Sequence, residues 1–364
     1  MQLNHLEVRD FRNVTLADID LSPGINLLVG KNGAGKTAIL EAVFLLARGR
    51  SFRTTHSKQL IRHSALELIV RGEVESAQLV HRLARGKSRN GESRARIDGE
   101  AALKQSRFAE LMPLQTLLPG IADLVLDGPS IRREFVDWGL FHVEHQYLDL
   151  TRRYRKALIQ RSAWLRSAQG LSFKQDPWAA DIARNGAQIN IRRRHFVASL
   201  NERIYNVIEG LTAEFDVKLA YQGANVAVDE ATLAAQMADA FERDCRQGIT
   251  NAGPHRNDID ILINGAKAKN VVSRGQAKLI ASAITLAYCA ELRHRSDILP
   301  ILLLDDFGAE LDKVYRERFF QELERIGCQV IATTTDEPKH LVGHGLAPRA
   351  RVFHVEQGTI SRYS

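Results

Sequence analysis

The sequence predicts an α/β fold, a mixed sheet with flanking helices, that is interrupted by an inserted helical segment. Three observations carry this prediction. The glycine-rich loop Gly30–Thr37 lies between an apolar run, Ile25–Val29, and a stretch of helical periodicity, 38–46. A second apolar run, 301–304, ends in two aspartates, and 130–210 has the texture of long helices. Short strands and helices on both sides of a long helical segment predict an α/β body with an inserted lobe.

The loop after the first apolar run has the spacing of a phosphate-binding loop. Its glycines let the backbone approach phosphate oxygens closely, and the following helix adds its positive N-terminal end. Lys36 can then pair with the β- and γ-phosphates, and the Thr37 hydroxyl can ligate Mg²⁺. The pattern predicts a site for a nucleoside triphosphate with Mg²⁺, in which Lys36 is also a catalytic candidate. The predicted binding residues are Gly30, Lys31, Asn32, Gly33, Ala34, Gly35, Lys36 and Thr37.

The second apolar run ends in two carboxylates of separate predicted roles. Ile301–Leu304 is apolar on both faces, as a buried strand of a parallel sheet is. Asp305 can hold Mg²⁺, and Asp306 can orient or deprotonate an attacking water. A strand ending in an acidic turn is common by itself, so these roles depend on the phosphate loop in the same chain.

A third motif, Ser273-Arg274-Gly275-Gln276, precedes a helical run at 279–292. Ser273 is suited to cap the helix, and Gly275 would let a phosphate approach the N–H groups of the first turn. Taken alone, the motif is also what an ordinary capped helix requires.

Phosphate loop, Ser-x-Gly-Gln motif and aspartate strand, in this order, resemble the ATP-binding-cassette ATPases. The resemblance implies an ABC-type head that uses ATP and Mg²⁺, with Ser273, Gly275 and Gln276 contacting the nucleotide of a second copy. It makes residues 308–312, Gly-Ala-Glu-Leu-Asp, a dimer-contact loop. Gln115 falls where that family has a glutamine that senses Mg²⁺ and the nucleophile, which makes it a metal and catalytic candidate.

The chain departs from the transporters of that family at two positions. Asp306 stands where they usually have glutamate, and the shorter side chain suggests slow turnover. Thr333-Thr334-Thr335 stands where they have a switch histidine, so one of these threonines is expected near the γ-phosphate. His255 could serve near the site instead, although a single histidine in a proline-containing turn is more often structural.

Four connecting segments make the chain similar to the RecF family in particular. The similarity implies an ATP-dependent homodimer with weak, DNA-stimulated ATP hydrolysis that binds single- and double-stranded DNA at gap junctions. It also implies cooperation with RecR and RecO in DNA replication, gap repair and SOS induction. The segments are Arg48-Gly49-Arg50-Ser51-Phe52-Arg53, residues 128–137 (GPSIRREFVD), residues 154–161 (YRKALIQR) and Gly253-Pro254-His255-Arg256-Asn257-Asp258.

The predicted organisation has three parts. Residues 1–129 form the N-terminal part of the head with the phosphate loop, 130–210 a helical lid, and 211–364 the rest of the head. The only clear breaks in the lid lie near Gly170 and Asp176-Pro177. Further predicted strands cover 3–8, 67–74, 77–82 and 94–97, with turns at Gly86, Asn90-Gly91 and Asp98-Gly99 and a hairpin over 352–360.

The basic residues gather in two clusters, 82–96 and 151–203, within a chain of net charge +7 and pI about 9.4. Such clusters fit contacts to nucleic-acid phosphates, and they fit solvated helix faces and hairpin tips equally well. The DNA-binding candidates are Arg85, Lys87, Arg89, Arg152, Arg153, Arg192 and Arg193.

The three cysteines show no metal-ligand spacing, and the N-terminus lacks the features of a signal peptide, so we expect a cytoplasmic protein without membrane contact. Three other functions remain open. A chromosome-structuring ATPase of the SMC type would need a far longer coiled coil than 130–210 supplies. A transporter's ATPase subunit would explain the ATP site without DNA. A nucleotide-dependent binding module would differ mainly in its negligible hydrolysis.

Overall fold

Two compact units, here called the body and the lobe, make up the chain in the computed structural model, which describes residues 1–167, 172–212, 214–222, 226–306, 313–335 and 350–362. The body comprises Met1–Ile121, Glu209–Thr212 and Ser282–Ser364, and the lobe comprises Ala122–Ile208 and Ala213–Ala281. The α/β class and the inserted helical segment are as predicted.

The predicted end of the insertion at residue 210 is wrong, because the strands that follow belong to the lobe. They form a small separate sheet of order β11-β10-β9. The amide of Asn201 on the long lobe helix donates to the Leu219 carbonyl at 2.8 Å and accepts from the Leu219 N–H at 2.7 Å, which ties β9 to that helix. A return of strand-like sequence therefore does not mark a return to the body.

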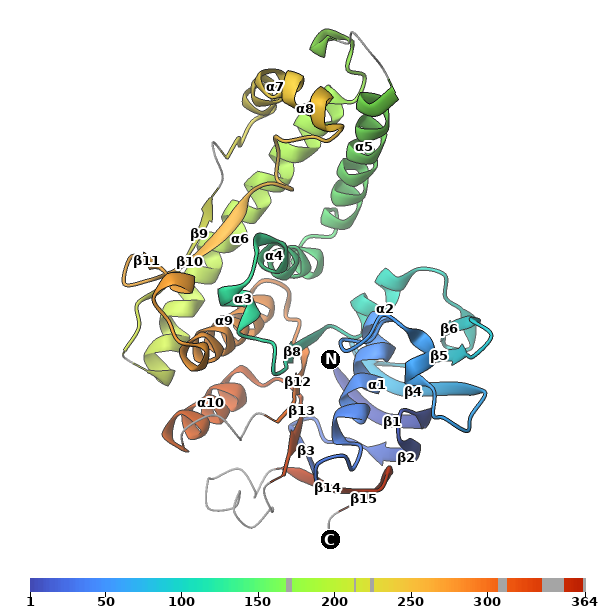
Figure 1. Cartoon of the computed structure of the whole chain (residues 1–364). Coiled ribbons are helices and arrows are strands. Elements are labelled where there is room, and N and C mark those ends of the chain that lie inside the picture. Colours follow the sequence, from blue (N-terminus) through green and yellow to red (C-terminus); the bar gives the residue numbers. More distant parts are fainter. Residues whose placement is uncertain (168–171, 213, 223–225, 307–312, 336–349, 363–364) are drawn as a thin grey trace. The chain divides into compact units, whose positions relative to one another are not determined.

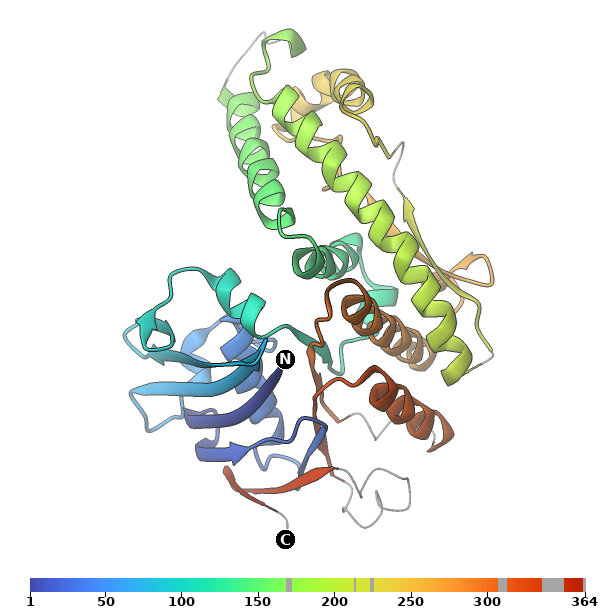
Figure 2. The same cartoon turned by 180° about the vertical axis from the view of Figure 1, so that it is seen from behind.

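The body is built on one twelve-stranded sheet with an antiparallel and a parallel half (Figure 1). Its order is β7-β6-β5-β4-β1-β2-β15-β14-β3-β13-β12-β8. In Figure 2 the C-terminal hairpin lies beside the first strands of the chain. The strands are β1 (Gln2–Phe11), β2 (Val14–Asp20), β3 (Ile25–Val29), β4 (Glu67–Ser76), β5 (Leu79–Ser88), β6 (Ser93–Ile97), β7 (Glu100–Ala101), β8 (Leu114–Leu117), β12 (Ile301–Leu304), β13 (Val330–Thr334), β14 (Arg351–Glu356) and β15 (Thr359–Arg362).

Helix α1 (Lys36–Arg48) packs between these two halves and is buried nearly all round. A helix that is apolar on every side must lie inside a core. Its buried Glu41 accepts two hydrogen bonds from Arg12, at 2.9 and 2.7 Å, and a third from Ser51. A buried carboxylate requires such partners, and Ser51 in the Arg-Gly-Arg-Ser-Phe-Arg segment supplies one of them. The other body helices are α2 (Gln105–Leu111), α10 (Lys313–Ile326), the 3₁₀ turn η1 (Ser57–Leu60) and the part of α9 (Arg274–Ser296) from Ser282 onward.

The β4–β5 hairpin differs from the prediction in its turn. The chain reverses at Ala77 and Gln78, which both have positive φ (51° and 66°), so β5 begins at Leu79. Neither residue type signals such a turn. Gly86, predicted as a turn, lies inside β5, whereas Gly91 and Gly99 have left-handed φ of 96° and 86° in the turns expected of them.

The lobe is mostly helical, and Figure 1 shows α7 and α8 beside one end of the α5–α6 pair. One break between helices, at residues 144–146 between α4 and α5, was not predicted from the sequence. The lobe elements are α3 (Asp123–Leu126), α4 (Pro129–Val143), α5 (Tyr147–Ser167), η2 (Phe173–Gln175), α6 (Ala179–Leu211), β9 (Val217–Gln222), α7 (Glu230–Asp239), α8 (Phe241–Gln247), β10 (Asp258–Ile263), β11 (Ala266–Lys267), η3 (Ala268–Asn270) and the start of α9 (Arg274–Ser296).

Buried polar pairs hold the lobe together. Arg132 on α4 donates two hydrogen bonds to Asp258, at 2.9 and 2.8 Å. Arg193 on α6 does the same to Asp137, at 2.7 and 2.8 Å. Arg132 thus joins the segments 128–137 and 253–258, and Arg193 joins both to α6, because it also donates to the Pro254 carbonyl at 2.7 Å. Charged residues of these segments therefore have structural partners. Within the described residues, no helix combines the length and apolar character that a membrane crossing needs.

His255 is one of these buried polar groups, and both of its ring nitrogens are hydrogen-bonded to other residues of the lobe. Its Nε2 lies 2.9 Å from the Thr250 carbonyl oxygen, and its Nδ1 lies 2.7 Å from the Tyr154 hydroxyl. Since a carbonyl only accepts, Nε2 carries the proton and Nδ1 accepts from the tyrosine. Burial is the main cause that lowers the pKa of His255 to about 4.

Acid should therefore destabilise the lobe through His255. Its pKa of about 4 in the fold lies below the unfolded value of 6.5, so the unfolded chain binds the proton first as pH falls. The stabilisation is complete above pH 6.5 and is lost toward pH 4, with a size on the order of 3 kcal/mol. Urea unfolding at pH 7 and 4.5 should show a larger loss for the natural chain than for His255→Gln. Equal losses in both would contradict this role.

Candidate nucleotide site

The phosphate loop connects β3 to α1 and has the backbone shape that only glycine adopts without strain. Gly33 and Gly35 have φ of 79° and 117°, both left-handed, and α1 begins directly after Gly35. A Cβ added at Gly30 would lie 2.2 Å from the Val355 carbonyl oxygen of β14. The three glycines thus serve two needs, a tight turn and close contact with a neighbouring strand.

The side chain of Lys36 is hydrogen-bonded to this loop. Its Nζ donates to the carbonyl oxygens of Gly30, at 2.5 Å, and Lys31, at 3.0 Å. Burial lowers the pKa of Lys36, and the carboxylates of Asp306 and Asp305 oppose that shift. The ammonium group therefore lies against the loop and within electrostatic range of the two aspartates.

Three oxygen-bearing side chains meet beside the loop. The hydroxyl of Thr37 donates to Asp305 Oδ1 at 2.9 Å, and the hydroxyl of Thr333 donates to the same oxygen at 2.7 Å. They come from α1, from the end of β12 and from β13, where parallel strands bring their carboxyl ends to one edge. Mg²⁺ prefers hydroxyl and carboxylate oxygens of this kind together with phosphate oxygens, so the set fits the ion.

Thr333 also fixes the second aspartate. The Asp306 N–H donates to Thr333 Oγ1 at 2.8 Å, and Asp306 has a left-handed φ of 50°. One hydroxyl thus accepts from one aspartate and donates to the other. Among Thr333, Thr334 and Thr335, the expected threonine near the site is therefore Thr333.

Asn13 and Gly358 brace the loop from outside, and the sequence analysis missed both. The Asn13 amide donates to the Gly33 carbonyl at 2.8 Å, and the Gly358 N–H donates to the Ala34 carbonyl at 2.9 Å. Gly358 was visible only as a hairpin turn, and a single asparagine after β1 carries no signal. Their role arises because β15 pairs with β2 and so brings the last hairpin against the loop.

Gln115 is not brought to this site, which corrects its predicted role. It pairs in register with Leu302, three residues before Asp305, which is about 10 Å along the strand. Leu114 and Leu303 face the core around α1, so the neighbouring Gln115 faces the other side of the sheet. There it lies near Tyr288 of α9, and it is 7% exposed.

Ser273 and Gln276 cap α9 reciprocally. The Ser273 N–H donates to Gln276 Oε1 at 2.9 Å, and the Gln276 N–H donates to Ser273 Oγ at 3.2 Å. Gly275 is exposed, and a Cβ there would meet only Ser273 Oγ, at 3.9 Å. The helix start is accessible and belongs to the lobe, while the phosphate loop belongs to the body. The predicted dimer-contact loop, 308–312, lies outside the described residues.

Two of the seven predicted DNA contacts are structural. Arg85 is 9% exposed, donates to the Leu46 carbonyl at 2.8 Å and lies over the Phe108 ring. Burial lowers its pKa to about 10. Arg193 is 5% exposed and bound to Asp137. A buried guanidinium cannot reach a DNA phosphate, so both predictions are wrong.

The other five predicted contacts differ in their exposure and in whether they have partners within the protein. Arg89 donates to the carbonyls of Ala65, Arg62 and His63, and Arg192 pairs with Glu144 at 3.1 Å. Lys87 is half-buried, and burial lowers its pKa. Arg152 and Arg153 are exposed on α5, followed by exposed Arg155 and Lys156. In the part of the chain that the structure describes, Arg153, Arg155 and Lys156 have no ion-pair partner.

Replacing Gly358 should cost more stability than replacing a left-handed glycine in open space. Gly99→Ala, with a φ of 86° and no atom within 4 Å, should cost about 1–2 kcal/mol from backbone strain. Gly358→Ala has a φ of 79° and places its Cβ 2.0 Å from the Asn13 carbonyl oxygen, which adds about 1–3 kcal/mol of overpacking. Urea unfolding of the two variants measures the difference. Equal losses of stability in the two variants would show that the C-terminal hairpin is not tightly packed against Asn13.

The comparisons with known proteins agree over nearly the whole chain. A relative from Shewanella baltica, named DNA replication and repair protein RecF, is 35% identical over 99% of both chains. A relative of the same name from Aliivibrio fischeri is 34% identical over 100% of both.

Two groups of solved structures share the fold. A structure of the recombination mediator protein RecF with ATP, in the RecFOR pathway, has a TM-score of 0.85 at 24% identity and covers 100% of this chain and 97% of that one. An Smc head bound to the C-winged helix domain of ScpA has a TM-score of 0.60 at 15% identity, with 100% and 97% covered. The family model described as RecF/RecN/SMC N terminal domain matches residues 2–361. The chain therefore belongs to the RecF family, within the RecF/RecN/SMC group of nucleotide-binding heads.

Proposed function

We propose that this chain binds ATP with Mg²⁺ and, in that form, pairs with a second copy to bind DNA as a recombination mediator in replication and gap repair. The oxygen cluster of Thr37, Asp305 and Thr333, set beside a loop with left-handed glycines, is the observation that carries the proposal. Membership in the RecF family favours this function over a transporter's ATPase subunit or a chromosome-structuring ATPase.

The phosphate loop would hold the triphosphate through its backbone N–H groups and the start of α1. Lys36 would exchange its two carbonyl contacts, Gly30 and Lys31, for the β- and γ-phosphates. Mg²⁺ would be held by Thr37 and Asp305 and would neutralise phosphate charge. Thr333 keeps Asp305 oriented, and Asn13 and Gly358 keep the loop in shape.

A second copy would complete the site. The exposed start of α9 carries Ser273, Gly275 and Gln276, and the N–H groups of Arg274 and Gly275 take no part in the reciprocal cap, so they can attract an anion at the helix N-terminus. The γ-phosphate of ATP on one chain would receive the α9 start of the other. ATP then favours the dimer because it binds the dimer better than the monomer.

Hydrolysis would release the pair. Asp306 is the general base for the attacking water, and its short side chain and fixed N–H limit its reach, which supports slow turnover. Gln115 has no part in this step, because it lies on the far side of the sheet. Weak ATPase activity that rises with DNA is the activity we propose.

DNA would contact the exposed basic face of α5, formed by Arg152, Arg153, Arg155 and Lys156. Positive groups without internal partners are available for phosphates, and such contacts read no sequence. Binding at the junctions of single- and double-stranded DNA, and work with RecR and RecO in the cytoplasm during gap repair and SOS induction, complete the proposal by family membership.

Thr333→Val should weaken both ATP·Mg²⁺ binding and hydrolysis. The change removes a hydrogen bond to a carboxylate, worth about 1.5–3 kcal/mol, so the affinity should fall about tenfold or more. Thr116→Val, the same change on β8, which pairs with β12, is the matched control. Titration with ATP in the presence of Mg²⁺ and steady-state phosphate release measure the two effects. The proposal for this site fails if both variants bind and hydrolyse ATP as the natural chain does.

Arg152→Ala combined with Arg153→Ala should lower the salt dependence of DNA affinity. Each lost phosphate contact reduces the slope of log affinity against log salt by about 0.9 on duplex DNA, so the pair should reduce it by about 1.8. Arg107→Ala combined with Arg325→Ala removes two exposed arginines of the body and should leave the slope unchanged. Fluorescence anisotropy between low and moderate salt gives the slopes. The same slope in both double variants would exclude α5 as the DNA surface.

A further inference from the structure

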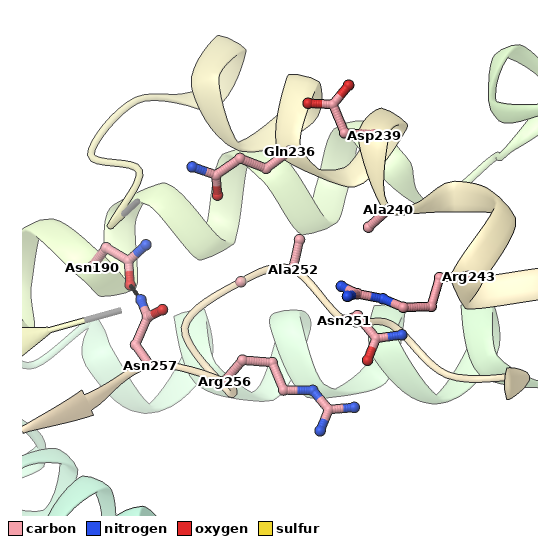
Figure 3. Close-up of a pocket in the computed structure, with 10 residues that line it drawn as sticks. Asn190, Gln236, Asp239, Ala240, Arg243, Asn251, Ala252, Arg256 and Asn257 are labelled. Atoms are coloured by element: carbon pink, nitrogen blue, oxygen red, sulfur yellow. Dashed lines mark hydrogen bonds between the residues drawn. The ribbon is translucent and has the colours of Figure 1, made fainter. Parts of the chain in front are cut away.

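A polar cavity of about 410 Å³ lies in the lobe, between α7, α8 and the loop 249–257 (Figure 3). Its volume falls within the range of small-molecule sites. Apart from two alanines and a glycine, every side chain that lines it is polar or charged. Neither the nucleotide site nor the basic face of α5 includes any of these residues.

The charges of the cavity are unbalanced toward positive. Arg243 of α8 and Arg256 of the loop contribute two guanidinium groups, and Asp239 is the one carboxylate among the lining residues that the structure describes. Within the described residues Arg243 has no hydrogen-bond or ion-pair partner. Arg256 uses its Nε for the Thr250 carbonyl, at 3.2 Å, and its terminal nitrogens have no partner among those residues. Two cations with spare donors face one open space.

Amides complete the wall with fixed orientations. The Asn257 amide nitrogen donates to Asn190 Oδ1 at 2.9 Å and to the Tyr221 hydroxyl at 3.2 Å, so its oxygen is left as an acceptor. The Asn251 amide nitrogen donates to Asp244 Oδ1 at 2.8 Å and leaves its oxygen in the same way. Figure 3 shows these amides and both arginines around the cavity.

The loop that carries Arg256 is rigid. Wholly buried Arg161 donates to Asp244 and Asp176, each at 2.6 Å, and to Thr250 Oγ1 at 2.8 Å. His255 holds the same Thr250 by its carbonyl. A Cβ at Gly253, whose φ is 127°, would lie 2.4 Å from the Tyr154 hydroxyl. A cavity whose walls are held this firmly is organised before a ligand arrives, which reduces the entropic cost of binding.

The lining of the cavity favours a ligand that carries a phosphate group together with other polar groups. Guanidinium forks match phosphate oxygens, and they outnumber the lining carboxylate. Among the described residues no aromatic side chain lines the cavity, so a stacked base alone is a poor ligand. The volume exceeds what a bare phosphate ion needs, and the amide oxygens suit sugar hydroxyls or the N–H groups of a base edge.

We propose that this cavity binds one nucleotide through its phosphate, with Arg243 and Arg256 on the phosphate and Asn251 and Asn257 on the sugar or base edge. The nucleotide is either free or the terminal unit of a DNA strand. In the second case the inference rests on the DNA binding proposed above. In the first case it stands without it.

The test uses the full chain carrying Lys36→Ala, so that the phosphate loop does not compete for nucleotide. Arg243→Ala with Arg256→Ala is compared with Arg246→Ala, an exposed arginine of α8 that does not line the cavity. Calorimetric titrations use dTMP, thymidine and a short single-stranded oligonucleotide with and without a 5′-phosphate. ATP binding by the double variant with Lys36 intact reports separately on the body.

We expect the arginine pair to lower affinity for the phosphate-bearing probes by about tenfold or more, with Arg246→Ala unchanged. Binding of dTMP identifies a free nucleotide, and binding of only the 5′-phosphorylated oligonucleotide identifies a strand end. Either result supports the site. Thymidine that binds as well as dTMP, or phosphate-bearing probes that bind the double variant and the control equally, would overturn the inference whatever happens at the ATP site.

Discussion

One carboxylate oxygen, Asp305 Oδ1, links the parts of the body on which the nucleotide site depends. It accepts one hydrogen bond from the Thr37 hydroxyl of α1 and another from the Thr333 hydroxyl of β13. The first of these joins residues that are 268 positions apart in the chain. The parallel pairing of β3, β13 and β12 makes this contact possible, because it places the three strand ends along one edge. Any change that shifts β12 against β3 separates Asp305, the proposed metal ligand, from the phosphate loop. The fully apolar β12 and the buried α1 therefore position the chemistry as well as the core.

Buried polar groups need hydrogen-bond partners, and this requirement explains why the clusters of basic residues in the sequence were misleading as a prediction of DNA contacts. Arginines at 85, 161 and 193 are buried and hydrogen-bonded inside the units. They belong to clusters that the sequence presents as basic surface. Exposed basic residues without an ion-pair partner among the described residues include Arg153, Arg155 and Lys156 of α5 and Arg243 of the lobe cavity. A count of positive residues therefore overestimates the DNA surface, and the ion-pair partners decide which members remain.

Local patterns predicted strand and loop well where the pattern is contained in a continuous segment. Ile25–Val29 is a strand with the predicted bounds, the loop after it has the left-handed glycines that its motif requires, and Thr37 contacts Asp305, although α1 begins at Lys36 inside the predicted loop. Failures occurred where the outcome depends on distant parts of the chain. Sheet register turned Gln115 away from the loop, and hairpin packing brought Asn13 and Gly358 to it. The end of the lobe was mistaken because β9 is fixed by a side chain of α6, which no local pattern reveals.

The most direct test of the account is the molar mass of the chain in solution with ATP and Mg²⁺, with and without a gapped duplex. The natural chain is compared with Ser273→Arg, which places a bulky charge at the exposed start of α9, and with Arg274→Ala, a change at the next position that leaves the motif intact. We predict a dimer that forms only with ATP, gains stability on the duplex and is lost in Ser273→Arg alone. A chain that stays monomeric with ATP, or a dimer that forms equally in Ser273→Arg, would contradict it.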